Sequence, residues 1–151
     1  MSIKVIKGGD IFTSKANIYV NATNASGVMG GGIAKLFRAK WPEYYSHYMR
    51  EYSAGQLRMG KVNTFFTSSG TPEIIASLHT MLRPGSAADL PAIIAGLNNL
   101  KTFMVGSLAN SVAIPALGCG IGGLNFAILQ SEVEDCFATA PELEVELYAP
   151  L

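Results

Sequence analysis

The segment "NATNASGVMGGGIAKLF", residues 21–37, places three glycines directly before a stretch with helical character. Glycines at a helix start cost conformational entropy, but they permit positive φ and let a phosphate approach backbone N–H groups without a Cβ in the way. The helix N-terminus adds partial positive charge. A second run, "GCGIGG" (118–123), also follows an apolar strand and precedes an amphipathic helix. One such loop is as typical of a tight turn, whereas two together favour a ligand with a diphosphate that is held from both sides.

Strand and helix patterns alternate along the chain, which predicts an α/β domain with a mixed, largely buried sheet. No internal repeat or linker divides it, so we expect one domain over residues 1–151. The second glycine run also satisfies G-x-G-x-x-G, but that fingerprint belongs to a first βαβ unit and here lies near the C-terminus, which argues against a Rossmann dehydrogenase. The expected strands are 3–6, 17–21, 60–68, 72–80, 111–117 and 144–149, and the expected helices are 31–54 with a break near Pro42, 87–104 and 125–138.

The composition narrows the classes of protein. Of 151 residues, 49% are hydrophobic and 15% are charged, which is typical of a compact folded chain. Eleven basic residues balance eleven acidic ones, so the net charge gives no sign of nucleic-acid or membrane binding, although a local basic patch stays open. No apolar stretch of about 18 residues and no signal-peptide pattern occurs. We therefore expect a cytoplasmic protein in which Cys119 and Cys136 are reduced, with no metal and no cofactor.

Four motifs together resemble the macro domain, an ADP-ribose-binding module. They are "KGGDIF" (7–12), "YVNATNASGVMGGGIAKLF" (19–37), "VAIPALGCGIGGL" (112–124) and "LYAP" (147–150), and they stand in the family's order across essentially the whole chain. The nearest branch holds the terminal ADP-ribose glycohydrolase, the DNA ADP-ribosyl glycohydrolase antitoxins and the yeast-type ADP-ribose 1''-phosphate phosphatase. The resemblance implies a three-layer α/β/α fold around a mixed sheet of roughly six strands.

The resemblance also implies roles for single residues. The carboxylate of Asp10 would accept from the exocyclic amine of adenine, which suits an acceptor-only side chain. Tyr148 would lie against the adenine, although sheet core is an alternative place for it. The amide of Asn24 would face the distal ribose hydroxyls. The full implied ligand set is Asp10, Ile11, Asn21, Asn24, Gly30, Gly31, Gly32, Thr80, Pro115, Gly118, Cys119, Gly120, Ile121, Gly122 and Tyr148.

Two departures from the family pattern bear on catalysis. The antitoxin-type hydrolases usually carry a lysine in the first loop, as "MGKG", where this chain has Gly31. The terminal glycohydrolase has an aspartate in the second loop, where this chain has Gly122. Both substitutions weaken the case for cleavage of ADP-ribose from protein or DNA. The absence of the lysine also makes the first loop more similar to that of the phosphatase-type members.

The remaining catalytic candidates are His79 and Asn24. His79 would titrate near neutral pH and could position water or protonate a leaving oxygen, although a histidine on an apolar strand is more often structural. Cys119 is a weaker candidate nucleophile, on the expectation that a helix N-terminus lowers the pKa of its thiol. Lys35 and Arg38 follow the first loop and either neutralise phosphate or, as the commoner case, form a solvated face.

Two classes of function therefore stand. The first is an enzyme that removes phosphate from ADP-ribose 1''-phosphate or, as a lesser alternative, cleaves an ADP-ribosyl bond. The second is a non-catalytic ADP-ribose reader or scavenger. The expected partners are ADP-ribose, its 1''-phosphate and ADP-ribosylated macromolecules, with no membrane and no nucleic acid. Binding of RNA or poly(ADP-ribose) is weaker still, because the neutral net charge gives it no electrostatic support.

Overall fold

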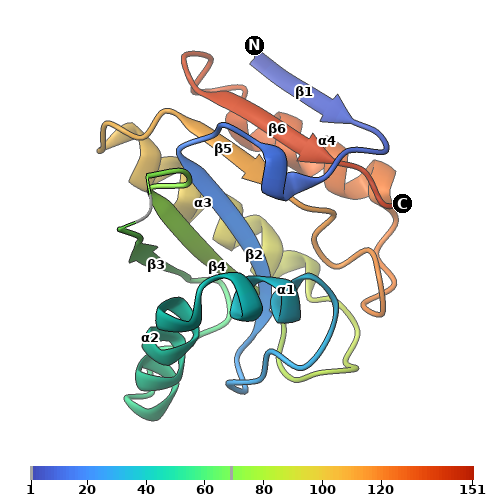
Figure 1. The fold of residues 1–151 in the computed structure, drawn as a ribbon. Helices are drawn as coiled ribbons and strands as arrows, with labels where there is room; N and C mark the ends of the chain where they lie inside the picture. Colours follow the sequence, from blue (N-terminus) through green and yellow to red (C-terminus); the bar gives the residue numbers. More distant parts are fainter. Residues whose placement is uncertain (1, 69) are drawn as a thin grey trace.

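A computed structural model describes residues 2–68 and 70–151, and its centre is one six-stranded sheet in the order β1-β6-β5-β2-β4-β3 (Figure 1). Neighbouring strands are parallel except β3, which pairs antiparallel with β4 at one edge. The mixed six-stranded sheet is the one expected from the sequence. The strand bounds are β1 Ser2–Ile6, β2 Ile18–Asn24, β3 Val62–Phe66, β4 Ile74–Met81, β5 Ser111–Ile114 and β6 Glu144–Tyr148.

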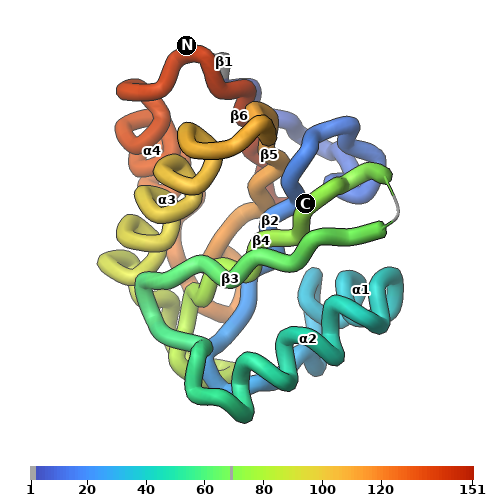
Figure 2. Tube along the Cα trace, turned by 90° about the vertical axis from the view of Figure 1, so that its left-hand side faces the viewer, coloured from blue at the N-terminus to red at the C-terminus, as the bar shows by residue number. Residues whose placement is uncertain are grey.

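Helices cover both faces of the sheet, and Figure 2 shows one pair on each side. The helices α1 (Gly32–Lys40) and α2 (Pro42–Ser53) lie on one face, and α3 (Leu90–Val105) and α4 (Phe126–Phe137) lie on the other. The three-layer α/β/α arrangement is thereby confirmed. A short 3-10 helix, η1 (Ile11–Thr13), was not expected; Asp10 caps it by accepting from the amide of Phe12. None of the helices in the described chain is long and apolar enough to cross a membrane.

The two hydrophobic cores follow from the alternation of side chains along the strands. In β2, Ile18 and Val20 pack toward α3 and α4, whereas Tyr19 between them packs toward α1 and α2. Ile74 and Ile75 divide in the same way on β4. Because both faces of these strands are covered, they read as nearly continuous apolar runs in the sequence.

The helix boundaries have local chemical causes. Pro42 ends α1 and starts α2, since the residue before a proline disfavours helical geometry. The side chain of Asp89 caps α3 by accepting from the amide of Ala92, and Asn125 caps α4 in the same manner. The N-cap of α1 is Gly31, which has no side chain to satisfy the first amides of that helix.

Five parallel strands bring their carboxyl ends to the same edge of the sheet. Ligands bind at this edge in open α/β sheets. The connections that leave it are residues 7–17 after β1, 25–31 after β2, 82–89 after β4 and 115–125 after β5. We call residues 25–31 the first loop and residues 115–125 the second loop, because the two glycine runs lie there. Residues 82–89 are the third loop.

Candidate functional site

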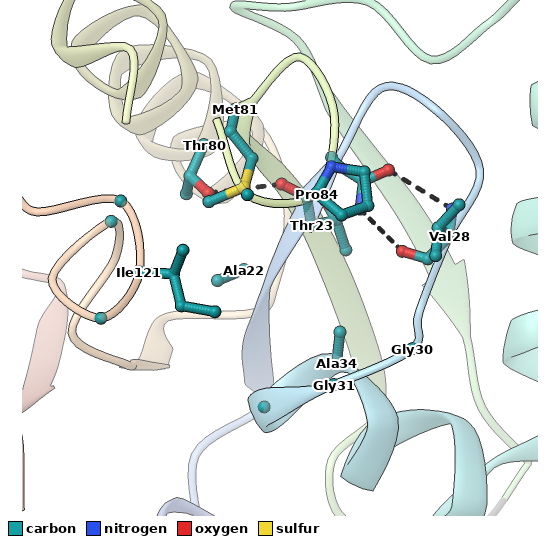
Figure 3. A pocket seen from close by; sticks show the side chains of 16 residues that line it. Ala22, Thr23, Val28, Gly30, Gly31, Ala34, Thr80, Met81, Pro84 and Ile121 are labelled. Atoms are coloured by element: carbon teal, nitrogen blue, oxygen red, sulfur yellow. Dashed lines mark hydrogen bonds between the residues drawn. The ribbon is translucent and has the colours of Figure 1, made fainter. Parts of the chain in front are cut away.

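A cleft of about 440 Å³ opens between the three loops (Figure 3). The third loop ties the other two together, since the hydroxyl of Ser26 donates to the carbonyl of Leu82 and the amide of Ala88 donates to the carbonyl of Gly122. The cleft is lined by Ala22, Thr23, Asn24, Val28, Gly30, Gly31, Gly32, Ala34, Thr80, Met81, Pro84, Gly85, Gly118, Gly120, Ile121 and Gly122.

The first loop presents bare backbone to this cleft. Gly32 has φ +58°, a conformation that L side chains rarely adopt. Gly31 is extended, with φ −159°, and a Cβ placed on it would meet no atom within 4 Å. Within residues 2–68 and 70–151, the amides of Gly30, Gly31 and Gly32 have no hydrogen-bond acceptor. They are therefore available to an anion, together with the uncapped start of α1.

The second loop faces the first across the cleft and is shaped by its own packing. A Cβ on Gly122 would stand 2.7 Å from the carbonyl oxygen of Gly118, so the two turns of the loop approach closely only because Gly122 lacks one. The amides of Gly120, Ile121 and Gly122 have no acceptor among the described residues. The side chain of Ile121 is 84% exposed and extends into the cleft from this loop (Figure 3). The second loop thus offers further amides beside an apolar clamp.

Several lining residues were missed by the sequence reading. The third loop contributes Pro84 and Gly85, which lie in the connection between the expected strand at 72–80 and the expected helix at 87–104 and had no expected role. Its position was available in principle, because β4 is parallel to β2 and ends at the same sheet edge. Ala22 and Ala34 are small residues that leave room in the cleft; both lie within the motif at 19–37, but no ligand contact was expected for them.

Asn24 lies in the cleft, but its amide is already engaged. Nδ2 donates to the carbonyl of Val28 at 2.7 Å, and Oδ1 accepts from the amides of Ser26 and Val28. The side chain therefore shapes the first loop. One N–H of the Nδ2 amine stays free for a ligand hydroxyl, since the amine carries two.

Three tyrosines of α2 contact the strands β2 and β4 and the start of the first loop. The hydroxyl of Tyr44 bonds with Asn21 and Ser77, and that of Tyr48 donates to the backbone carbonyl of Asn24 at 2.6 Å. The ring of Tyr52 lies so near Gly27 that a Cβ there would be 2.7 Å from it. Their spacing of four residues places all three on one helix face.

Asn21 does not line the cleft. It is fully buried, and its Nδ2 donates to the hydroxyl of Tyr44 and weakly to the sulfur of Met29. Its Oδ1 has no partner among the described residues. Asn21 therefore joins the sheet to α2. Because its side chain is buried outside the cleft, it does not offer the ligand contact that was expected for it.

His79 also lies outside the cleft, behind Thr23. Its Nδ1 accepts from the Thr23 hydroxyl at 2.8 Å, and its Nε2 donates to Oδ1 of Asn63 at 3.0 Å. That amide orientation is fixed because Nδ2 of Asn63 donates to the carboxylate of Glu51. Burial lowers the pKa of His79 to about 4, so the ring is neutral near pH 7. The geometry argues against the expected acid or water-positioning role and gives His79 a structural one.

Cys119 was expected at a helix N-terminus, and that expectation is wrong. Helix α4 begins only at Phe126, after the loop has turned again, and its cap is Asn125. The thiol of Cys119 donates to the carbonyl of Leu117, and burial raises its pKa. A thiol with a raised pKa is a poor nucleophile.

The residues expected around the adenine lie at the same sheet edge but not in the cleft. Ile11 and Tyr148 are buried in the core on the α1–α2 face. Gly9 packs against the Tyr148 ring, since a Cβ there would be 3.3 Å from it. Asp10 is exposed. Pro115 is buried at the start of the second loop.

The structure thus brings nine of the expected residues into one cleft. They are Asn24, Gly30, Gly31, Gly32, Thr80, Gly118, Gly120, Ile121 and Gly122. Among the described residues that line it, none has a titratable side chain. No three metal-ligating side chains cluster anywhere in the described chain. The cleft can therefore hold an anionic, hydroxyl-rich molecule through backbone amides, but its own side chains offer no group that transfers a proton.

Comparison with known proteins gives matches over the same region. The family model of the macro domain matches residues 20–133. The chain is 30% identical over 145 residues to a DNA ADP-ribosyl glycohydrolase of Mycobacterium tuberculosis, covering 94% of this chain and 41% of that protein. A DNA ADP-ribosyl glycohydrolase of Thermus aquaticus is 25% identical, with 95% and 40% covered. The chain spans about two fifths of the length of these relatives.

Solved structures agree in fold. The macrodomain of Mycobacterium tuberculosis DarG has a TM-score of 0.94 at 29% identity, covering 99% of this chain and 98% of that one. Thermosipho africanus DarTG in complex with ADP-ribose has a TM-score of 0.92 at 24% identity, covering 99% of this chain and 42% of that one.

Proposed function

The chain belongs to the macro domain family, and from this premise we propose that its cleft binds ADP-ribose. The observation that carries the proposal is the pair of glycine loops facing each other, with six backbone amides free of acceptors among the described residues and no acidic side chain between them. Backbone amides at a helix start bind phosphate oxygens without a counter-charge. The ADP-ribose complex of Thermosipho africanus DarTG, which shares the fold, supports this choice of ligand. We further propose that residues 1–151 form one macro domain, since β1 and β6 complete the sheet outside the matched region.

A second candidate function is hydrolysis of ADP-ribose derivatives. The relative that is 30% identical is a DNA ADP-ribosyl glycohydrolase, which favours cleavage of ADP-ribose from a DNA strand. The phosphatase activity on ADP-ribose 1''-phosphate and a reader without catalysis are the alternatives. Gly31 at the position of the expected lysine, and a cleft without titratable side chains, favour slow hydrolysis or none.

Calorimetric titration with ADP-ribose tests the binding proposal. We expect binding of ADP-ribose and none of free ribose, since the free amides recognise the diphosphate. Absence of heat at millimolar ADP-ribose would refute the proposal. The same preparation is then incubated with ADP-ribose 1''-phosphate and with an ADP-ribosylated oligodeoxynucleotide. Release of phosphate identifies a phosphatase, and release of ADP-ribose from the oligodeoxynucleotide identifies a glycohydrolase. If neither product forms, the chain is a reader.

Asp10→Asn tests the adenine contact. Asparagine keeps an oxygen for the amide of Phe12, so η1 stays capped, but it then turns an N–H group toward the adenine amine. We expect ADP-ribose affinity to fall by roughly 1–3 kcal/mol, the range of a lost charge-assisted hydrogen bond. Unchanged affinity would remove Asp10 from the site.

A further inference from the structure

A second concave surface adjoins the cleft on the other side of the first loop. It has a volume of about 280 Å³ and is formed by the end of the first loop, one side of α1 and the first residue of α2. Gly30 lines both this surface and the cleft. We call it the α1 shelf; its residues are Met29, Gly30, Lys35, Arg38, Ala39 and Pro42.

The α1 shelf is positively charged, in contrast to the cleft. Lys35 and Arg38 are exposed and lie three residues apart, so they share one face of α1. Helix α1 contains three basic residues and no acidic one. Neither Lys35 nor Arg38 forms an ion pair with any residue of the described chain, and Glu43 beside the shelf is not within salt-bridge distance of them. The neutral net charge thus conceals a local cationic surface.

The guanidinium of Arg38 is held in place without being neutralised. Its Cζ lies 4.2 Å from the centroid of the Tyr45 ring. Such a contact fixes the side chain while leaving its N–H groups free for an oxyanion. Ala39 and Pro42 add an apolar wall beside the two cations. This combination of cations and apolar surface fits the phosphates and sugars of a nucleic-acid strand.

We propose that Lys35 and Arg38 bind backbone phosphates of a DNA strand that carries the ADP-ribose held in the cleft. The proposal rests on the proposed function, because the resemblance places the distal ribose, to which an acceptor is attached, at the first loop. A strand that leaves the cleft past Gly30 meets the α1 shelf directly. The same contacts serve a glycohydrolase and a non-catalytic reader.

The test compares four probes: ADP-ribose, a single-stranded oligodeoxynucleotide with one ADP-ribose, the same strand unmodified, and an acidic peptide with one ADP-ribose. The variant is Lys35→Ala with Arg38→Ala. The matched control is Arg58→Ala with Lys61→Ala, which removes an exposed arginine and lysine three residues apart on the α2–β3 connection. Thermal melting verifies that both variants fold.

We expect the wild type to bind the modified strand more tightly than ADP-ribose, with a steeper salt dependence. Loss of two phosphate contacts should lower the slope of log K against log salt by about 1.4. Between 50 and 200 mM salt, the wild type then loses about sevenfold more affinity for the modified strand than the double variant does. The affinity for free ADP-ribose should stay unchanged in the double variant, and the control should behave as wild type throughout.

Equal binding of the modified strand by wild type and double variant would overturn the α1 shelf and leave the ADP-ribose proposal intact. If the modified acidic peptide also binds more tightly than free ADP-ribose, by the same factor as the modified strand, and the double variant loses this difference, DNA is not the specific partner. Failure of the wild type to bind free ADP-ribose would overturn the proposed function and the shelf with it.

Discussion

Substitution of Gly122 by alanine tests the packing of the second loop most directly. The new Cβ would stand 2.7 Å from the carbonyl oxygen of Gly118 and 2.9 Å from the Cβ of Ala88, whereas ordinary contact begins near 3.4 Å. The turns must therefore separate by about 0.7 Å, which also strains the hydrogen bond from Ala88 to the Gly122 carbonyl. Gly122 needs no positive φ, so the effect is one of contact alone.

Overpacking of this kind lowers the free energy of unfolding by about 1–3 kcal/mol. For a chain of this length, the melting temperature should fall by roughly 2–12 °C. Urea denaturation at pH 7 measures the free energy, and calorimetric titration with ADP-ribose measures the affinity. We expect both to fall, since a displaced loop also misplaces its free amides.

Gly120→Ala is the matched control on the same loop. A Cβ on Gly120 meets no atom within 4 Å, and its φ is not in the positive range. The free energy of unfolding should stay the same or rise by up to about 1 kcal/mol, through the lower entropy of the unfolded chain. The methyl group would nevertheless intrude on the cleft and weaken ADP-ribose. If the Gly122 variant is as stable as the Gly120 variant, the contact argument is wrong.

Three further predictions concern the surroundings of the cleft. Tyr48→Phe should destabilise the fold by about 1–2 kcal/mol and weaken ADP-ribose, because the carbonyl of Asn24 loses its donor, whereas Tyr45→Phe should change neither; urea denaturation and titration decide. Burial lowers the pKa of His79 to about 4, so between pH 6.5 and pH 4 this histidine is protonated in the unfolded chain but neutral in the native state. The free energy of unfolding that neutral His79 contributes is complete above pH 6.5 and declines by up to about 3 kcal/mol toward pH 4. Urea denaturation of His79→Gln between these pH values should show a smaller decline. A decline as steep as that of the wild type would contradict the assignment to His79. Gly31→Lys should fold normally, since a Cβ at this position faces open space and its φ is −159°. The variant should release ADP-ribose faster from a modified oligodeoxynucleotide. An unchanged rate would show that the lysine alone does not confer catalysis.

Much of the fold was predictable from the sequence because its signals are local. The strands are apolar and bounded by turn residues, and the break at Pro42 needs only the steric rule for the residue before proline. Strand order was not predictable from such signals, because it depends on pairings far apart in the chain. The short helix η1 was missed for a different reason: a cap such as Asp10 is also typical of an ordinary turn.

The glycine loops of the candidate site were predictable from the sequence. The roles of side chains whose chemistry depends on their burial were not. Both glycine runs lie in the cleft as expected. The sequence shows His79 as a titratable group, but only the fold shows that Thr23 and Asn63 occupy both of its nitrogens. The expected helix at 125–138 is present, but the residues between Cys119 and Asn125 separate the thiol of Cys119 from the start of α4, so the thiol does not lie at a helix N-terminus.

The free amides of the two glycine loops also shape how this domain can lose its ligand through mutation. A side-chain contact disappears when its atoms are deleted, but a main-chain donor survives every substitution except proline. Alanine scanning of the cleft would therefore understate the site, because truncations there remove little that binds. Inactivating changes should instead be those that add atoms, at Gly32, Gly118 or Gly122, where the backbone angle or a close neighbour leaves no room. A random mutant library selected for loss of binding should be enriched in bulky residues at glycine positions.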